Sequence, residues 1–158
     1  MQQVAPFFRD FGLQPAPAET ILLRWRPVDS DVVFSANQLS EGTLRFICLA
    51  TLLLSPEPPR LVVLDEPELG LHPYAIVQLA GVLRSASVRG QFIVATQSVT
   101  LMNQFELPDL IVVERRDGAF VFDRPPPDSL REWLDEYSLG ELWEKNLIGD
   151  RPGPERPS

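Results

Sequence analysis

Two carboxylates, Asp65 and Glu66, directly follow the four apolar residues 61–64. An apolar run of this kind predicts a buried parallel strand, and open α/β sheets bind their ligands at the edge where such strands end. Asp65 could hold a Mg²⁺ ion, usually through water, while Glu66 could polarise an attacking water. The alternative is a buried strand followed by a solvated acidic turn, and these residues alone do not decide between the two.

Two further polar clusters are predicted to reach the same edge. Ser40, Glu41 and Gly42 precede a long apolar segment, so they mark a helix start whose free N–H groups and positive dipole end suit a phosphate. Gln97 follows the short β-type run 91–95, where its amide could sense the γ-phosphate of a nucleotide. Ser40 as a plain helix cap and Gln97 as a polar loop residue are the alternatives.

The elements that must position these clusters follow from the apolar periodicity and the capping signals. After residue 40 the order is helix, strand, helix, strand, short helix and strand, which predicts an α/β fold with a parallel sheet. Before it, residues 1–17 are interpreted as a packed connector and residues 21–34 as a hairpin. The predicted helices are 41–54, 73–88 and 98–104, with two more after residue 129, and the later strands are 61–64, 91–95, 110–114 and 119–122.

Composition limits the class of protein. With 158 residues and 44% hydrophobic content, the chain can build one globular domain, predicted over residues 1–149 with a disordered tail at 150–158. The net charge of -8 argues against a chain-wide nucleic-acid surface. Cys48, alone in an apolar run, is predicted to be buried, and one cysteine permits no disulfide framework. Since no signal peptide or membrane span is evident, we expect a soluble cytoplasmic protein.

Read together, these segments resemble the ATPases of the AAA family with ABC-like heads, related to the RecF and SMC proteins. Residues 39–43 resemble the ABC signature motif, residues 61–66 the Walker B motif, residues 68–73 the D-loop, and residues 95–98 the switch position. The resemblance extends to about Gly149. It implies an incomplete three-layer P-loop NTPase-like fold, the cofactors ATP and Mg²⁺, and a head that dimerises around the nucleotide.

The resemblance also assigns roles to the residues that carry it. Glu66 and Gln97 are the implied catalytic residues and Asp65 the implied metal ligand. The implied nucleotide-binding residues are Ser40, Glu41 and Gly42.

Two departures from the family pattern are evident. No Gly-x-x-x-x-Gly-Lys-Ser/Thr stretch occurs, and the single lysine is Lys145, so the P-loop that cradles the phosphates is missing. In the family this loop lies upstream of the signature motif, and the chain therefore resembles the C-terminal half of a head. The second departure is Gln97 in place of the usual histidine, because an amide cannot carry a proton as an imidazole does.

Two functions from different classes remain open. The first is an ATPase head that dimerises around Mg-ATP, in which this chain, lacking the P-loop, is a poor ATPase alone and tends to associate through open strand edges. Its partner is then a second copy or an ATPase half that carries the P-loop. The alternative is a non-catalytic interaction module that docks on, or completes in trans, a partner ATPase. A transporter subunit is disfavoured, and contact with nucleic acid rests on family analogy only.

Overall fold

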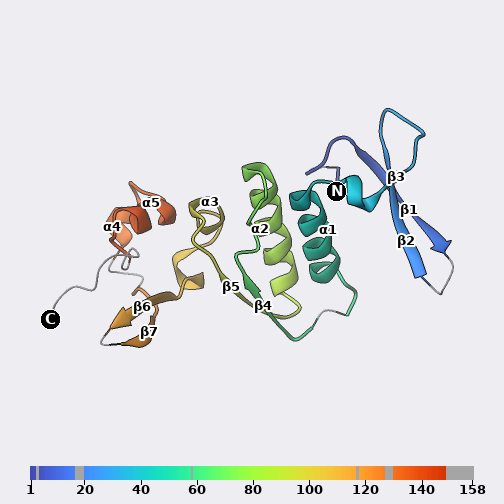
Figure 1. Cartoon of the computed structure of the whole chain (residues 1–158). Helices are drawn as coiled ribbons and strands as arrows, with labels where there is room; N and C mark the ends of the chain where they lie inside the picture. The colour runs from blue at the N-terminus through green and yellow to red at the C-terminus, as the bar shows by residue number, and fades with distance from the viewer. Residues whose placement is uncertain (3, 17–19, 58, 117, 127–129, 149–158) are drawn as a thin grey trace. The chain divides into compact units, whose positions relative to one another are not determined.

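The computed structural model describes residues 1–2, 4–16, 20–57, 59–116, 118–126 and 130–148. The chain divides into two compact units, Met1–Ala95 and Thr96–Ser158 (Figure 1). The tail predicted at residues 150–158 lies outside the described residues. In the part of the chain that is described, no helix is both long enough and apolar enough to cross a membrane.

The first unit begins with an antiparallel sheet of strands β1 (Phe8–Ala16), β2 (Thr20–Pro27) and β3 (Phe34–Ser35), in the order β1-β2-β3. Trp25 is buried and stacks with Phe8 and Phe34. The expected connector at residues 1–17 is therefore wrong, because most of it is strand β1. Its apolar side chains alternate along the strand and pair across to β2, as Phe11 does with Trp25.

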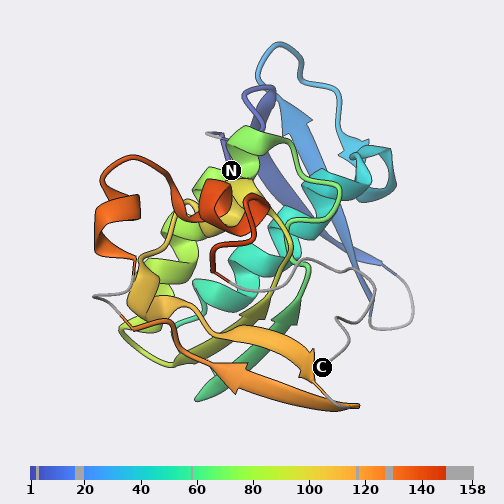
Figure 2. The same cartoon turned by 90° about the vertical axis from the view of Figure 1, so that its left-hand side faces the viewer.

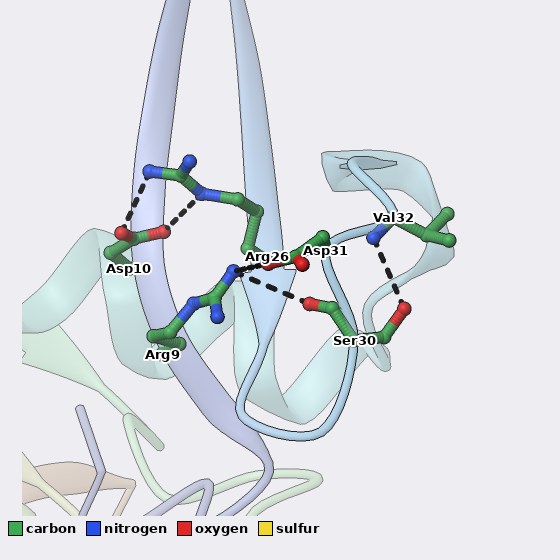
Figure 3. A network of polar contacts seen from close by, with 6 residues as sticks. All are labelled: Arg9, Asp10, Arg26, Ser30, Asp31 and Val32. Carbon is green, nitrogen blue, oxygen red and sulfur yellow. Dashed lines mark hydrogen bonds and ion pairs between the residues drawn. The ribbon is translucent and has the colours of Figure 1, made fainter.

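A polar network ties the loop after β2 to strand β1 (Figure 3). Arg26 donates two hydrogen bonds of 2.8 Å to the carboxylate of Asp10, and its guanidinium lowers the pKa of Asp10. Arg9 donates to the backbone oxygen of Ser30 at 3.3 Å and to Asp31 at 3.1 Å. The predicted strand at 31–34 accordingly shrinks to the two residues of β3, because side-chain contacts hold the preceding loop.

The remainder of the first unit is helix α1 (Glu41–Leu53), strand β4 (Leu61–Asp65), helix α2 (Pro73–Ser87) and strand β5 (Gln91–Ala95). These four elements agree with the sequence predictions to within about a residue. Strands β4 and β5 are parallel, with Leu61 paired to Gln91 and Asp65 to Ala95. Helices α1 and α2 pack against each other, as both views show (Figures 1 and 2), and α2 contacts β5.

The parallel sheet has one covered and one bare face. Val62 on one face is buried. The opposite face leaves three apolar side chains exposed: Leu61 (51%), Val63 (65%) and Ile93 (48%). We call these three residues the bare sheet face. Because parallel sheets are normally covered on both faces, this arrangement is incomplete by itself.

Helix α1 is also less buried than expected. Only Phe46 and Leu53 are buried within it, and Cys48 is exposed, so the prediction of a buried thiol is wrong. Helix α1 packs against α2, and its Leu44 and Ile47 pack against the cluster that contains Trp25, while the apolar residues on its other sides remain accessible.

The second unit contains helix α3 (Val99–Met102), the 3₁₀ turn Leu107–Asp109, strands β6 (Val112–Arg116) and β7 (Ala119–Asp123), and helices α4 (Arg131–Leu134) and α5 (Leu139–Glu144). The predicted β6–β7 hairpin is confirmed. Among the described residues, β6 pairs with β7 only. The strand predicted at 110–114, which corresponds to β6, therefore does not join the parallel sheet of β4 and β5.

Candidate functional site

The acidic turn, residues 65–72, begins where strand β4 ends. Both Asp65 and Glu66 are exposed. Glu66 has a φ of 43°, a left-handed conformation that is uncommon for residues other than glycine. Its N–H donates to the carbonyl oxygen of Ala95 at 2.9 Å, which fixes this conformation at the end of the β4–β5 ladder. Such local strain is often found at functional sites, where the surrounding structure holds it.

The signature segment, residues 39–43, forms the start of helix α1. Ser40 is the N-cap: its hydroxyl oxygen accepts from the N–H of Thr43 at 3.2 Å and lies 2.8 Å from the Thr43 hydroxyl. Ser40 is exposed, and so is Glu41. Ser40 is thus the cap of α1, and it remains exposed to solvent.

Helix α1 and the acidic turn are joined directly. The Gly42 backbone approaches Gly70 so closely that an added β carbon would lie 2.3 Å from the Gly70 carbonyl oxygen. Arg45 donates from Nη1 to the carbonyl oxygen of Leu69 at 3.0 Å and also lies 3.9 Å from the carboxylate of Glu41. The structure therefore brings the signature segment into direct contact with the Leu69–Gly70 part of the acidic turn.

This junction was missed in the sequence. The resemblance implies only a nucleotide contact for Gly42, and no local pattern indicates a role for Arg45. A glycine in the first turn of one helix and a second glycine in a nearby turn offered a weak signal of close backbone contact.

The switch segment, residues 96–98, belongs to the second unit. Gln97 is exposed, and the Ser98 N–H donates to the hydroxyl of Thr96 at 3.0 Å. Ser98 caps α3 by accepting from the N–H of Leu101 at 3.2 Å, as predicted. Gln97 follows the last residue of β5 by two positions in the sequence.

The donors present fit a hydrated Mg²⁺ ion better than a fully coordinated metal. No group of three or more His, Cys, Asp or Glu side chains suited to a metal occurs among the described residues. Asp65 offers one exposed carboxylate, which is sufficient for an ion that keeps several waters. His72 accepts from the N–H of Tyr74 at 3.3 Å through Nδ1 and caps α2, consistent with a turn residue.

Comparison with known proteins places the chain among ATPases. A family model described as "AAA domain, putative AbiEii toxin, Type IV TA system" matches residues 3–103. The Nod factor export ATP-binding protein I of Rhizobium etli is 34% identical over 93 residues. A "Putative ABC transporter ATP-binding protein" of Streptomyces coelicolor is 32% identical over 121 residues. The matches span 57% and 76% of this chain but only 29% and 20% of those relatives.

Solved structures support the fold. One chain, from work on ATP-driven dimerization and DNA-stimulated activation of SMC ATPases, matches with a TM-score of 0.64 and 20% identity, covering 85% of this chain and 84% of that one. The Smc head of Pyrococcus furiosus, bound to the C-terminal domain of ScpA, matches with the same TM-score and identity and is covered over 35% of its length. The chain thus has part of a P-loop NTPase-like fold related to SMC ATPase heads.

Proposed function

Since the chain belongs to the AAA domain family described as "putative AbiEii toxin, Type IV TA system", we propose that it forms one half of an ABC-type ATPase head. In this proposal Asp65 orients Mg²⁺, Glu66 polarises the attacking water and Gln97 contacts the γ-phosphate. The phosphate cradle comes from a P-loop outside these 158 residues. The isolated chain is then a poor ATPase.

The bare sheet face carries this proposal. Leu61, Val63 and Ile93 lie on the sheet that ends at the acidic turn, and they leave about half or more of their surface in water. A P-loop follows a strand and opens a helix. Such a unit would add a strand to the sheet and lay a helix on the bare face, which would bring its phosphate cradle to the end of the sheet where Asp65 and Glu66 stand.

The exposed helix start gives the proposal its second part. In a complete head, ATP would lie between the P-loop, Asp65 and Glu66 of one subunit and the Ser40 and Gly42 backbone of the other. Nucleotide bound in this way favours the dimer by mass action. The ATP-driven dimerization described for SMC ATPases, one of which has a similar fold, supports this arrangement. We place the assembly in the cytoplasm.

The test is to express the chain together with the polypeptide encoded immediately upstream of the Met1 codon, and to measure Mg-ATP turnover and ATP-dependent dimerisation. Glu66→Gln is expected to abolish turnover and to preserve the ATP-bound dimer, since the amide is isosteric but not a base. Ser40→Arg is expected to prevent dimerisation. Ser85→Arg, on an exposed position of α2, is the matched control and leaves both measurements unchanged.

Two results would contradict the proposal that the chain is half of an ATPase head. The first is turnover by the isolated chain that Glu66→Gln abolishes, because the site would then be complete without a P-loop. The second is the absence of any P-loop upstream combined with ATP-dependent binding to a separate ATPase. That result supports the second candidate, a non-catalytic module, which the exposure of Ser40 and Glu41 favours because trans contact with a nucleotide needs only the helix start.

A further inference from the structure

Helix α3 directly follows the switch segment, with Ser98 as its N-cap, yet α3 is too short to be stable alone. It spans only Val99–Met102, and isolated helices far longer than this are marginal in water. Its orientation must therefore come from tertiary contacts. Within the second unit, helix α5 packs against α3, and Met102 also lies in a buried cluster with Leu107 and Leu130.

The first turn of α5 packs closely against α3. The N–H of Gly140 donates to Oδ1 of Asn103 at 2.7 Å, and this hydrogen bond is partly buried. A β carbon at Gly140 would lie 2.4 Å from Cγ1 of Val99 and 2.8 Å from the same Asn103 oxygen. Only a glycine permits this approach, because a larger residue would push the two helices apart.

Apolar packing surrounds the polar contact. Leu101 of α3 and Leu142 of α5 are both fully buried. Met102 and Leu139 belong to one buried cluster, against which Trp143 packs. The Gly140 N–H lies next to these apolar side chains. Removing the Asn103 Oδ1 atom would therefore leave this N–H without its acceptor in a partly buried environment.

Hydrogen bonds within the α3 turn connect Asn103 and Met102 to the residues at its start. The N–H of Asn103 donates to the Val99 oxygen at 3.0 Å, and that of Met102 donates to the Ser98 oxygen at 2.8 Å. Ser98 in turn is tied to Thr96 on the other side of Gln97. Gln97 thus lies between Thr96 and Ser98, which are bonded to each other, and of these two Ser98 is also bonded to α3.

We propose that Asn103 and Gly140 are positioning residues for the switch, through which helix α5 sets the place of Gln97. The reading of Gln97 as a nucleotide contact rests on the proposed function, whereas the mechanical link does not. Displacement of α5 would release the switch segment and leave the acidic turn with its own contacts intact.

The first test measures hydrogen exchange of single amides by NMR in the full chain. The reporters are the N–H groups of Ser98, Leu101 and Met102, and the reference is residues 62–64 of β4. Asn103→Ala is expected to speed exchange at the reporters about five- to tenfold, as loss of one hydrogen bond implies. Asn103→Asp keeps the acceptor oxygen and is expected to restore exchange to within about twofold of the natural chain. The β4 amides should not change.

Two substitutions at the contact between Gly140 and Val99 provide an independent test. Gly140→Ala is expected to speed exchange at the same reporters, and adding Val99→Ala should reverse most of the effect by removing the methyl group that the new β carbon meets. Gly81→Ala, where nothing lies within 4 Å of the added carbon, is the control. Equal reporter exchange in the natural chain and Asn103→Ala would overturn the proposal, as would failure of Asn103→Asp to restore it.

A measurement in the assembled head separates this inference from the proposed function. Asn103→Ala is expected to lower kcat for ATP at least threefold with KM unchanged, since it displaces Gln97 and leaves the phosphate cradle intact. If the exchange results hold and no assembled head hydrolyses ATP, the proposed function fails and the positioning link stands. If the head is active and kcat is unaffected, the positioning role for Gln97 is wrong.

Discussion

Gly42 and Gly70 touch through their backbones: a β carbon on Gly42 would lie 2.3 Å from the Gly70 carbonyl oxygen. Gly70 itself has a φ of +78°, a conformation that glycine adopts at little cost. The two glycines therefore allow the start of α1 to sit directly on the acidic turn. Arg45 adds a hydrogen bond from the same helix to Leu69.

Replacing Gly42 by alanine is expected to destabilise the chain by about 1–3 kcal/mol, because the added methyl group must displace the acidic turn. The measurement is the free energy of unfolding from urea titration. Gly81→Ala, at an open position inside α2, should instead stabilise by about 0.5–1 kcal/mol. If Gly42→Ala leaves the free energy of unfolding unchanged, the contact between α1 and the acidic turn is loose.

Charging the bare sheet face is expected to reduce self-association of the isolated chain. In Val63→Lys the new ammonium group would replace an apolar side chain that is 65% exposed, and it would deter pairing of one bare sheet with another. Sedimentation velocity across a concentration series is the measurement. Val77→Lys, at a 39% exposed position on α2, is the control and should associate like the natural chain. If the natural chain, Val63→Lys and Val77→Lys associate equally, self-association occurs through another surface.

Cys48 should react readily with a thiol reagent in the folded chain. Its exposure on α1 leads us to expect one equivalent of label without denaturant, at a rate within about tenfold of that in urea. The readout is mass spectrometry over a time course. Protection by a factor of a hundred or more would mean that α1 is covered in solution.

Acid should weaken the start of α5. The backbone N–H and hydroxyl of Ser138 each donate to Glu141 at 2.8 Å, and these bonds lower the pKa of the Glu141 carboxyl. Because the folded pKa lies below the ordinary value of about 4.3, this stabilising contribution is complete above that value. It is lost as the pH falls through the folded pKa.

The pH effect can be assigned with one variant and one spectrum. Titration of the Glu141 carboxyl carbon by NMR should give a midpoint below that of the same group in a short unfolded peptide. In Glu141→Gln the corresponding part of the acid-dependent loss of thermal stability should disappear. An identical pH dependence in the variant would exclude Glu141 as its source.

The local elements of residues 40–104 could be predicted because their signals are local. Ser40 and Ser98 cap helices, Pro73 opens one, and the apolar run before Asp65 forms a strand, each governed by neighbours within a few residues. Strand β1 is not evident in the sequence because its apolar alternation breaks between Phe8 and Phe11, where the pairing with β2 shifts register, and because Pro15 lies within it.

The sequence by itself determined the order of elements between residues 40 and 104, the identity of the polar clusters and the lack of a P-loop within these residues, since each depends on neighbouring side chains. The tertiary structure decided which backbones touch and which apolar faces remain bare. The contacts of Gly42 with Gly70 and of Gly140 with Asn103 join residues 28 and 37 positions apart. No local pattern encodes such contacts, because packing selects them only after the helices and strands have formed.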